Sequence, residues 1–354
     1  PSAEGGSMVA VGLFGACCSY LVSSAGMSIF NKLAITALPL PITLVLIQMV
    51  FTVATTLAGW RAVHIGSRLD ALRWGCTVPL LFNAMLVSSM YAMRHNTLGT
   101  ISVFRNVAPL ITLCIERAFH VPIEIDRDSI LSLFTILAGV ILYHFSAIHI
   151  SSLGLTAIFV NIVFAVLERL LQRHLLSHVC RESAASIPHS LHGARFAACT
   201  APRHARSRPQ NPVDISKPGM MLINNTVGVA LNGALLLAYN EAAEWPVRLQ
   251  QLGGGEWTMI VASCLNGVAI SYAGLRVQQL VTATTFMVLT NANKFVVILF
   301  GIMALNEKTS LLSSFGMALS IGGALWYAKA RAALAERPRP KGDEDETKPL
   351  QPVP

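Results

Sequence analysis

Apolar residues form long, nearly continuous stretches along this chain, and most of its charged residues lie between them. A helix of about 20 apolar residues spans the hydrocarbon core of a bilayer. Ten stretches have about this length, at residues 9–36, 42–60, 76–94, 98–116, 129–147, 151–172, 220–240, 257–275, 281–305 and 309–330. The pattern predicts an all-α polytopic membrane protein with ten transmembrane helices.

The composition supports a membrane protein and argues against several other classes. Hydrophobic residues make up 53% of the 354 residues and charged residues 12%, whereas soluble domains carry about 25% charged residues. The seven cysteines form no Cys-x-x-Cys pair and no histidine has metal-ligand spacing, so we expect no disulfide framework, metal or cofactor. No catalytic signature occurs in a suitable context, so the protein is not expected to be an enzyme.

Basic residues are distributed unequally over the predicted loops. If the N-terminus is cytosolic, nineteen of the 26 lysines and arginines lie on the cytosolic side, three on the opposite side and four within spans. Loops rich in lysine and arginine stay on the cytosolic side of a membrane. Both termini are therefore expected in the cytosol, and the net charge of +8 reflects this asymmetry rather than nucleic-acid binding.

Ten helices divide into two halves of five, residues 1–148 and 149–332. The halves would have opposite orientations in the membrane, because five is odd. The fourth span, Thr100–Glu116, and the ninth, Thr284–Glu307, each have a Thr/Ser-rich start, an embedded basic residue beside asparagine, and a terminal glutamate. Inverted repeats with a substrate site between them are typical of secondary transporters. We therefore predict two inverted five-helix repeats.

Two segments depart from this pattern. Residues 181–211 are rich in Arg, His, Pro, Ala and Ser without helical periodicity, which predicts a disordered cytosolic insertion in the second half or a mistaken gene model. Residues 333–354 are polar and are expected to form a flexible cytosolic tail. In the last span, the Gly316/Ser320 spacing permits close helix approach, which we assign to internal packing, with a homodimer interface as the alternative.

The ninth span carries the most informative polar residues. Lys294 lies in its middle, Thr290 and Asn291 precede it on the same helical face, and Asn293 is adjacent. A lysine at bilayer depth costs at least about 2.5 kcal/mol on insertion scales, which makes it a candidate functional residue. Its amine suits a phosphate, the amides suit a base or sugar, and Arg105 would add a second basic group. Snorkelling of the lysine to the interface is the alternative.

Other polar residues near span ends admit two interpretations. Asn224 and Asn225 begin the seventh span and either face a cavity corner or form interhelical hydrogen bonds. Lys32 ends the first span and either lines a cavity mouth or snorkels. Glu168 and Arg169 are expected to form a local structural pair near the cytosolic edge.

The segment TTFMVLTNANK, residues 284–294, resembles the ninth-helix signature of nucleotide-sugar transporters, in the GDP-mannose branch of the drug/metabolite transporter superfamily. Thr284, Thr285 and Phe286 correspond to the Thr-Thr-aromatic start of that signature. Asn293–Lys294 corresponds to the end of the Gly-Ala-Leu-Asn-Lys motif, and Thr290-Asn291-Ala292 replaces its first three residues. The resemblance implies that this helix faces the phosphate and ribose portion of a ligand.

The resemblance extends to other helices, over roughly residues 9–177 and 212–332. Leu222-Ile223-Asn224-Asn225 corresponds to a Phe-Tyr-Asn-Asn motif whose asparagines are associated with nucleobase recognition, although the aromatic pair is replaced here. The remaining matches are Ser271 in the polar eighth-helix site, Arg105 in the fourth-helix segment SVFRN, and the first-helix pair Asn31–Lys32.

Taken together, these features predict an antiporter that exchanges a cytosolic GDP-sugar for luminal GMP by alternating access, across the Golgi membrane or, alternatively, the endoplasmic reticulum membrane. A UDP-sugar or triose-phosphate-type carrier of the same superfamily is one rival hypothesis. A non-transporting membrane scaffold or receptor is another.

Overall fold

The protein is described here by a computed structural model that covers residues 2–118, 126–146, 151–176, 213–280, 283–307 and 309–336. The segment 181–211 and the end of the tail lie outside the described residues. The helical elements are α1 (Ser2–Ala37), α2 (Pro41–Ala58), η1 (Trp60–Ala62), α3 (Arg68–Gly75), α4 (Val78–His95), α5 (Leu98–Phe104), η2 (Arg105–Val107), α6 (Ala108–Ala118), α7 (Arg127–Ser146), α8 (Ser152–Leu176), α11 (Lys217–Tyr239), η3 (Glu241–Glu244), α12 (Trp245–Gln250), α13 (Gly254–Leu280), α14 (Ala283–Ala304) and α15 (Leu311–Glu336).

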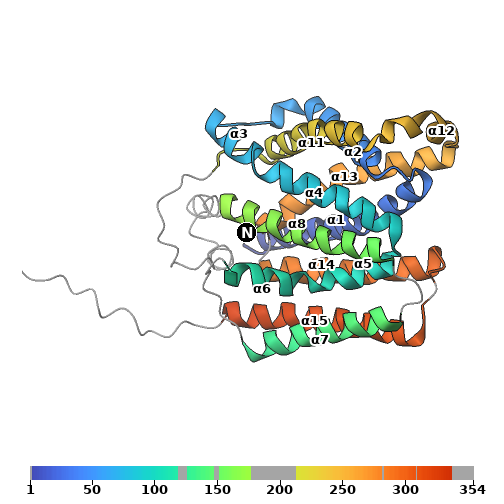
Figure 1. The fold of residues 1–354 in the computed structure, drawn as a ribbon. Helices are drawn as coiled ribbons and strands as arrows, with labels where there is room; N and C mark the ends of the chain where they lie inside the picture. The colour runs from blue at the N-terminus through green and yellow to red at the C-terminus, as the bar shows by residue number, and fades with distance from the viewer. Residues whose placement is uncertain are drawn as a thin grey trace, which may run out of the picture.

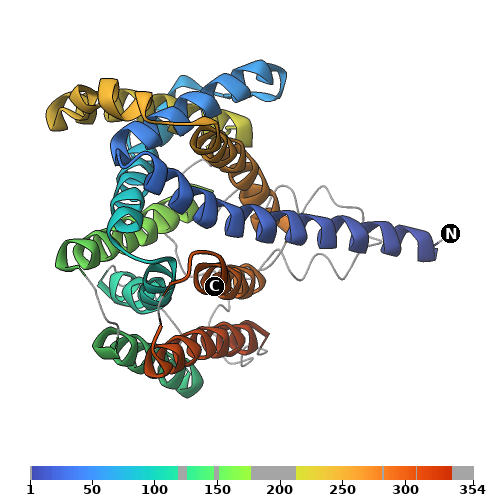
Figure 2. The same ribbon diagram turned by 90° about the vertical axis from the view of Figure 1, so that its right-hand side faces the viewer.

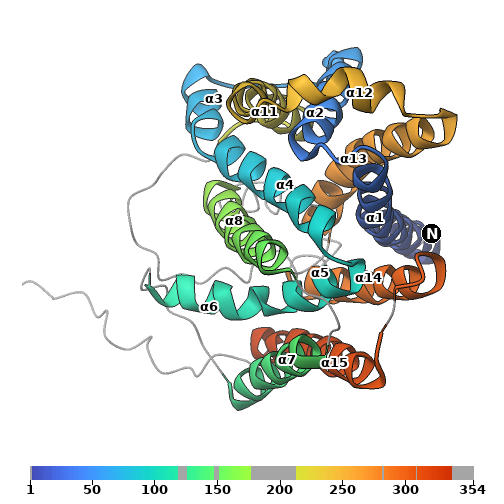
Figure 3. The ribbon, with the colours of Figure 1, turned by 45° about the vertical axis from the view of Figure 1, so that its right-hand side comes forward.

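Most of these helices lie side by side, with their axes running in the same general direction (Figure 1). The helices are stacked across their axes (Figure 3). Helices α2, α3, α11 and α12 form one side of the bundle, and α7 and α15 form the opposite side. Helices α1, α4, α8, α13 and α14 lie between these two sides. The long helix α1 crosses the bundle and contacts α4, α13 and α14 (Figure 2). Residues far apart in the sequence therefore meet in the middle layers.

Within the described residues, eight segments are long and apolar enough to cross a membrane. They are Pro41–Ala58, Arg68–His95, Leu98–Ile115, Arg127–Phe145, Ser152–Gln172, Lys217–Tyr239, Gly254–Gly274 and Leu311–Arg331. The helices α1, with 36 residues, and α14, with 22, are also long. The prediction of an all-helical polytopic membrane protein is confirmed, whereas the number of ten spans and the inverted repeats stay predictions.

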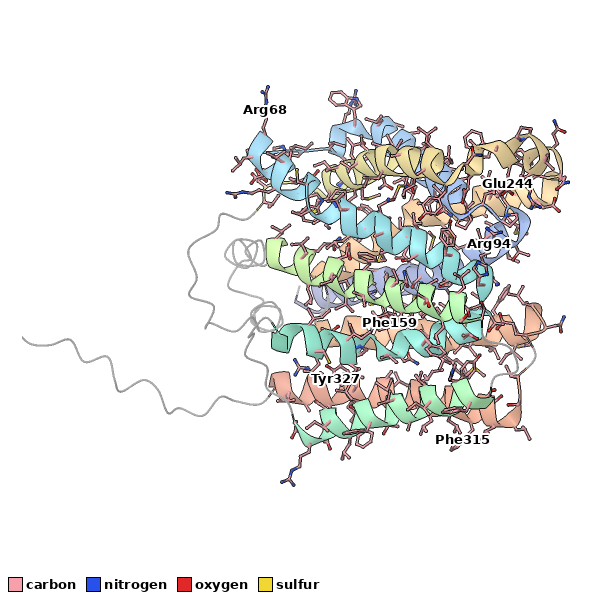
Figure 4. The ribbon with its side chains drawn as sticks, viewed as in Figure 1. Arg68, Arg94, Phe159, Glu244, Phe315 and Tyr327 are labelled. Carbon is pink, nitrogen blue, oxygen red and sulfur yellow. The ribbon has the colours of Figure 1, made fainter. Side chains whose placement is uncertain are left out.

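Large apolar side chains cover the outside of the bundle as well as its core. The largest buried cluster joins the inner faces of α1, α2, α4, α8 and α13, through side chains such as Met49, Met90 and Ile158. On the outer surface Phe159 and Phe315 are 59% and 60% exposed (Figure 4). Lipid tails are as apolar as these rings, so outward-facing phenylalanines are favourable in a bilayer.

Helices α7 and α15 pack backbone against backbone. A Cβ atom added at Gly139 would lie 2.5 Å from the Ser320 nitrogen, and one at Gly316 would lie 2.7 Å from the Tyr143 nitrogen. One at Gly323 would lie 2.8 Å from the Ile136 nitrogen. The small residues predicted to permit close helix approach therefore serve internal packing.

We expect Gly139→Ala to lower the thermal unfolding temperature of the detergent-purified protein, because the new methyl group would collide with backbone atoms of α15. Overpacking of this kind typically costs about 1–3 kcal/mol. Gly322→Ala is the matched control, since a Cβ at this position of α15 has no neighbouring atom within 4 Å. Equal unfolding temperatures for the two variants would contradict the close packing of α7 on α15.

Two acidic side chains connect the ends of α11 and α14 to the starts of α2 and α5. Glu241, which follows α11, accepts hydrogen bonds from the N–H groups of Ile42 (3.2 Å) and Thr43 (2.9 Å) at the start of α2. Glu307, which follows α14, accepts from Leu98 (2.6 Å) and Gly99 (3.0 Å) at the start of α5. A carboxylate satisfies the unpaired N–H groups of a helix N-terminus and interacts favourably with its dipole.

Candidate functional site

The candidate site surrounds a break in a helix. Helix α5 ends at Phe104, Arg105–Val107 form the tighter turn η2, and α6 begins at Ala108. Pro109 has no N–H group, so it cannot bond to the carbonyl oxygen of Arg105 four residues earlier. The N–H of Ala108 bonds to that oxygen instead, which closes a 3₁₀ turn. The proline explains why the helix tightens at this point in the middle of a span.

Arg105 extends from this break toward α4 and α8. Its guanidinium donates from Nε (3.2 Å) and Nη2 (2.9 Å) to Oδ1 of Asn161, and from Nη2 to Oγ of Ser89 (2.8 Å). Nδ2 of Asn161 donates to the backbone oxygen of Met85 (2.7 Å), which holds the amide oxygen toward Arg105. These partners are neutral, so they position the guanidinium without neutralising its charge.

Lys294 approaches the same break from α14. Its Nζ donates to Oδ1 of Asn106 at 2.6 Å, and Nδ2 of Asn106 donates to Oγ of Ser320 on α15 at 2.9 Å. Asn106 is almost completely buried. The lysine therefore reaches into the bundle rather than to the edge of the bilayer, and the structure brings it to the residue next to Arg105.

Asn293 joins α14 to α1. Its Nδ2 donates to Oγ of Ser24 at 2.7 Å, and its side chain is buried. Its Oδ1 is buried as well and has no hydrogen-bond partner among the residues that the structure describes. An unpaired buried acceptor costs free energy comparable to a lost hydrogen bond. Asn293 thus fixes the position of Lys294 and also leaves one acceptor available beside it.

The described residues show no salt bridge between Glu168 and Arg169, and their local structural pairing stays a prediction. The carboxylate of Glu168 is buried and accepts a hydrogen bond from Gln172, one turn further along α8. The side chain of Arg169 is exposed. Adjacent residues on a helix point in directions about 100° apart, which separates the two side chains.

Asn224 and Asn225 lie in a different part of the bundle. Helix α11 packs against α2, α3 and α4, and both asparagines are buried. Oδ1 of Asn224 accepts from Nε1 of Trp74 on α3 (2.8 Å), and Nδ2 of Asn225 donates to the backbone oxygen of Met221 (2.8 Å). The interhelical hydrogen bond predicted as one alternative is therefore present for Asn224, while no contact in the described residues joins the pair to Lys294.

Lys32 has a structural role that was not predicted. Its Nζ donates to the backbone oxygens of Met93 (2.6 Å) and Asn96 (2.7 Å), just past the end of α4. A basic group at a helix C-terminus satisfies unpaired carbonyl groups and complements the helix dipole. The amine of Lys32 is therefore bonded to the end of α4 rather than placed at the break, and a role at a cavity mouth stays a prediction.

The remaining predicted residues are less informative. Ser271 donates to the backbone oxygen of Gly267 in its own helix (2.8 Å), and Thr290 is half-buried on α14. Thr285, Phe286 and Asn291 belong to α14, but their side chains lie outside the described residues.

Sequence reasoning missed the polar residues that hold the basic groups in place. The missed residues are Ser24, Ser89, Asn106, Asn161 and Ser320. Their signal in the sequence is a polar residue inside an apolar span, but such residues also make routine interhelical hydrogen bonds, so the signal does not identify their partners.

Comparisons with known proteins now bear on this arrangement. No protein-family model matches the chain. The chain is 23% identical to GDP-fucose transporter 1 of Arabidopsis thaliana over 92% of its own length and 90% of that protein. It is 21% identical to GDP-mannose transporter GONST3 of the same plant, over 94% of this chain and 84% of that protein. It is 20% identical to GDP-mannose transporter GONST1, also of the same plant, over 88% of this chain and 87% of that protein. The chain resembles GDP-sugar transporters along nearly its whole length.

The fold is similar to that of a protein of known crystal structure. The TM-score is 0.54 at 13% identity, and the alignment covers 92% of this chain and 99% of the other. At this identity the likeness concerns the fold alone.

The resemblance to the GDP-mannose branch, first indicated by the motif around Lys294, is confirmed by the three transporters named above.

Proposed function

We propose that this chain is a nucleotide-sugar transporter, which exchanges a cytosolic GDP-sugar for luminal GMP. The observation that carries the proposal is the position of Lys294 in the middle of the bundle. Its amine donates to the neutral amide of Asn106, the residue that follows Arg105 in the sequence. Phosphate oxygens are the natural partners of basic groups held in this way, because hydrogen bonds between ionised groups are the strong ones. The relatives named as GDP-fucose and GDP-mannose transporters support the same ligand class.

The asparagines of α11 provide a second point of recognition. Within the described residues no hydrogen bond uses Nδ2 of Asn224 or Oδ1 of Asn225. This leaves one donor on Asn224 and one acceptor on Asn225 for the base in this proposal. Guanine offers a complementary edge, with the O6 acceptor near its N–H donors. In this proposal Trp74 orients Asn224, the asparagine pair binds the base, and Lys294 and Arg105 bind the phosphates of one elongated ligand.

Transport requires that each ligand bind the cytosol-facing and lumen-facing states with different contacts, since equal affinity would shift no equilibrium. Rocking of the two halves around the central site is the general mechanism of inverted-repeat transporters. Residence in the Golgi membrane, with both termini cytosolic, belongs to the same proposal.

Counterflow into proteoliposomes tests the proposal. Vesicles are preloaded with GMP, and uptake of labelled GDP-mannose, GDP-fucose and UDP-N-acetylglucosamine is compared with uptake into empty vesicles. GDP-sugar uptake that depends on internal GMP is the expected result. Uptake of the UDP-sugar alone would overturn the assignment of the base, and absence of uptake by well-folded protein would favour a triose-phosphate-type carrier or a non-transporting scaffold.

A further inference from the structure

The short helix α3 carries an exposed face on which two leucines lie between two arginines. Leu69 and Leu72 are 57% and 62% exposed, and Arg68 and Arg73 beside them are exposed as well. Successive residues of a helix point about 100° apart, so these four side chains fall within one face about 140° wide. This set of four residues is called the α3 outer face below.

The other side of α3 is fixed to the bundle. Trp74 is buried, and its Nε1 donates to Oδ1 of Asn224 on α11 at 2.8 Å. The indole packs in a buried cluster with Val78 and Ile215. Because this side faces inward, the α3 outer face is turned away from the bundle, and Arg68 projects outward in Figure 4.

The arginines of the α3 outer face are not paired with acids. In the part of the chain that the structure describes, neither guanidinium makes an ion pair or a hydrogen bond. The carboxylate of Asp70, the acid of α3, accepts from Oγ of Ser67 at 2.8 Å at the start of the helix. The turn before α3 adds Trp60, which is 67% exposed, and Arg61, which is exposed. The surface therefore fits a partner that is both anionic and apolar.

Helix α3 lies between two membrane-crossing segments, which places it at the surface of the bilayer. The preceding segment ends at Ala58, and α4 begins at Val78. The apolar segment that starts at Arg68 has 28 residues. A helix of that length is about 42 Å long, whereas the hydrocarbon core of a bilayer is about 30 Å thick. Helix α3 therefore reaches beyond the hydrocarbon core into the headgroup region, on the side predicted to be cytosolic.

We propose that the α3 outer face binds anionic phospholipids of the cytosolic leaflet. Leu69 and Leu72 insert at the acyl-chain boundary, and Arg68 and Arg73 bond to the headgroup phosphates. Helices that lie in the membrane interface have this composition, and the anionic lipids of the cytosolic leaflet attract basic residues next to a span. This lipid site is distinct from the site at Lys294, and it uses the predicted orientation of the chain but not the proposed substrate.

The double variant Arg68→Gln/Arg73→Gln tests the inference. Detergent-purified protein is titrated with phosphatidylserine or with phosphatidylcholine, and bound lipid is counted by native mass spectrometry. Each arginine near an anionic lipid surface changes affinity roughly fivefold, so the double variant should bind phosphatidylserine about 25-fold more weakly, and Arg68→Gln alone about fivefold. Binding of phosphatidylcholine and the unfolding temperature should be unchanged, because both side chains are exposed.

The matched control is Arg94→Gln/Arg127→Gln, which removes the same charge from exposed positions outside the α3 outer face. Arg94 lies at the far end of α4 from Arg68 (Figure 4), and Arg127 begins α7 on the opposite side of the bundle. This control should keep the phosphatidylserine affinity of the wild-type protein.

Equal phosphatidylserine affinity in the two double variants would overturn the inference and would favour an acidic protein as the partner of α3. Glycerophosphoserine, which has the same headgroup without acyl chains, should bind far more weakly than the lipid. If it binds as tightly, the leucines contribute nothing and a lipid site is excluded. Because the measurement is lipid binding, a failure of GDP-sugar exchange in proteoliposomes would overturn the proposed function and leave this result intact.

Discussion

Lys294→Met is expected to abolish measurable nucleotide-sugar exchange without unfolding the protein. Methionine fills a similar volume with apolar atoms and removes the free-energy cost of burying a charge, which offsets the loss of the hydrogen bond to Asn106. The variant loses the basic group proposed to contact phosphate. Truncation of one partner in a buried charged contact typically costs about 2–5 kcal/mol, equivalent to a decrease in affinity of roughly 30-fold or more. Counterflow and the unfolding temperature, measured on the same preparation, separate the two effects.

Lys329→Met is the matched control for this experiment. Lys329 lies on α15 near its end and is exposed. Its replacement should leave both exchange and stability unchanged. If Lys294→Met exchanges nucleotide-sugars at the rate of Lys329→Met, Lys294 does not bind the phosphate and the site must lie elsewhere in the bundle.

The described hydrogen-bond partners of the two basic residues differ from those of the acidic residues. Lys294 and Arg105 are held by asparagine and serine side chains, whereas the carboxylates of Glu241 and Glu307 cap the starts of helices. A carboxylate beside Lys294 would compete with phosphate for the same donors, but a neutral amide orients the amine without this competition. The two acids thus hold helices together, and the phosphate-binding role of Lys294 and Arg105 is the part that the substitution experiments test.

The sequence predicted the helices better than it predicted the contacts between them. Hydropathy located the apolar spans, and the cost of an embedded charge identified Lys294 and Arg105 as candidate site residues. The break in the fourth span before Pro109 was not predicted. The partners of the basic residues were not predictable, because Lys294 and Asn106 are 188 positions apart and helical periodicity carries no information at that separation.

The same limitation applies to Lys32. A lysine at the end of an apolar span usually snorkels to the interface. Lys32 instead donates to backbone oxygens 61 and 64 positions away, at the end of α4. Its role follows from where α1 and α4 meet, which depends on packing of the whole bundle and not on the local sequence.

Asn106→Asp is the second change with a large expected effect. The substitution keeps the shape of the side chain and places a carboxylate about where Oδ1 now lies, 2.6 Å from Nζ of Lys294. The hydroxyl of Ser320, which now accepts from Nδ2, can rotate and donate to the new carboxylate. We therefore expect the variant to fold, and the KM for GMP and GDP-sugar to rise at least about tenfold, because the new ion pair must be broken before phosphate binds.

Combining Asn106→Asp with Lys294→Met tests whether the new carboxylate forms an ion pair with Lys294. The double variant has no lysine for the carboxylate to pair with, so a large coupling energy between the two substitutions in unfolding free energy is expected, since residues in direct contact are rarely additive. An unchanged KM in Asn106→Asp, measured with normal stability, would show that the amine of Lys294 is not the group that phosphate must reach. In that case Lys294 and Asn106 would be assigned to holding α14 against η2, and the phosphate site would lie elsewhere in the bundle.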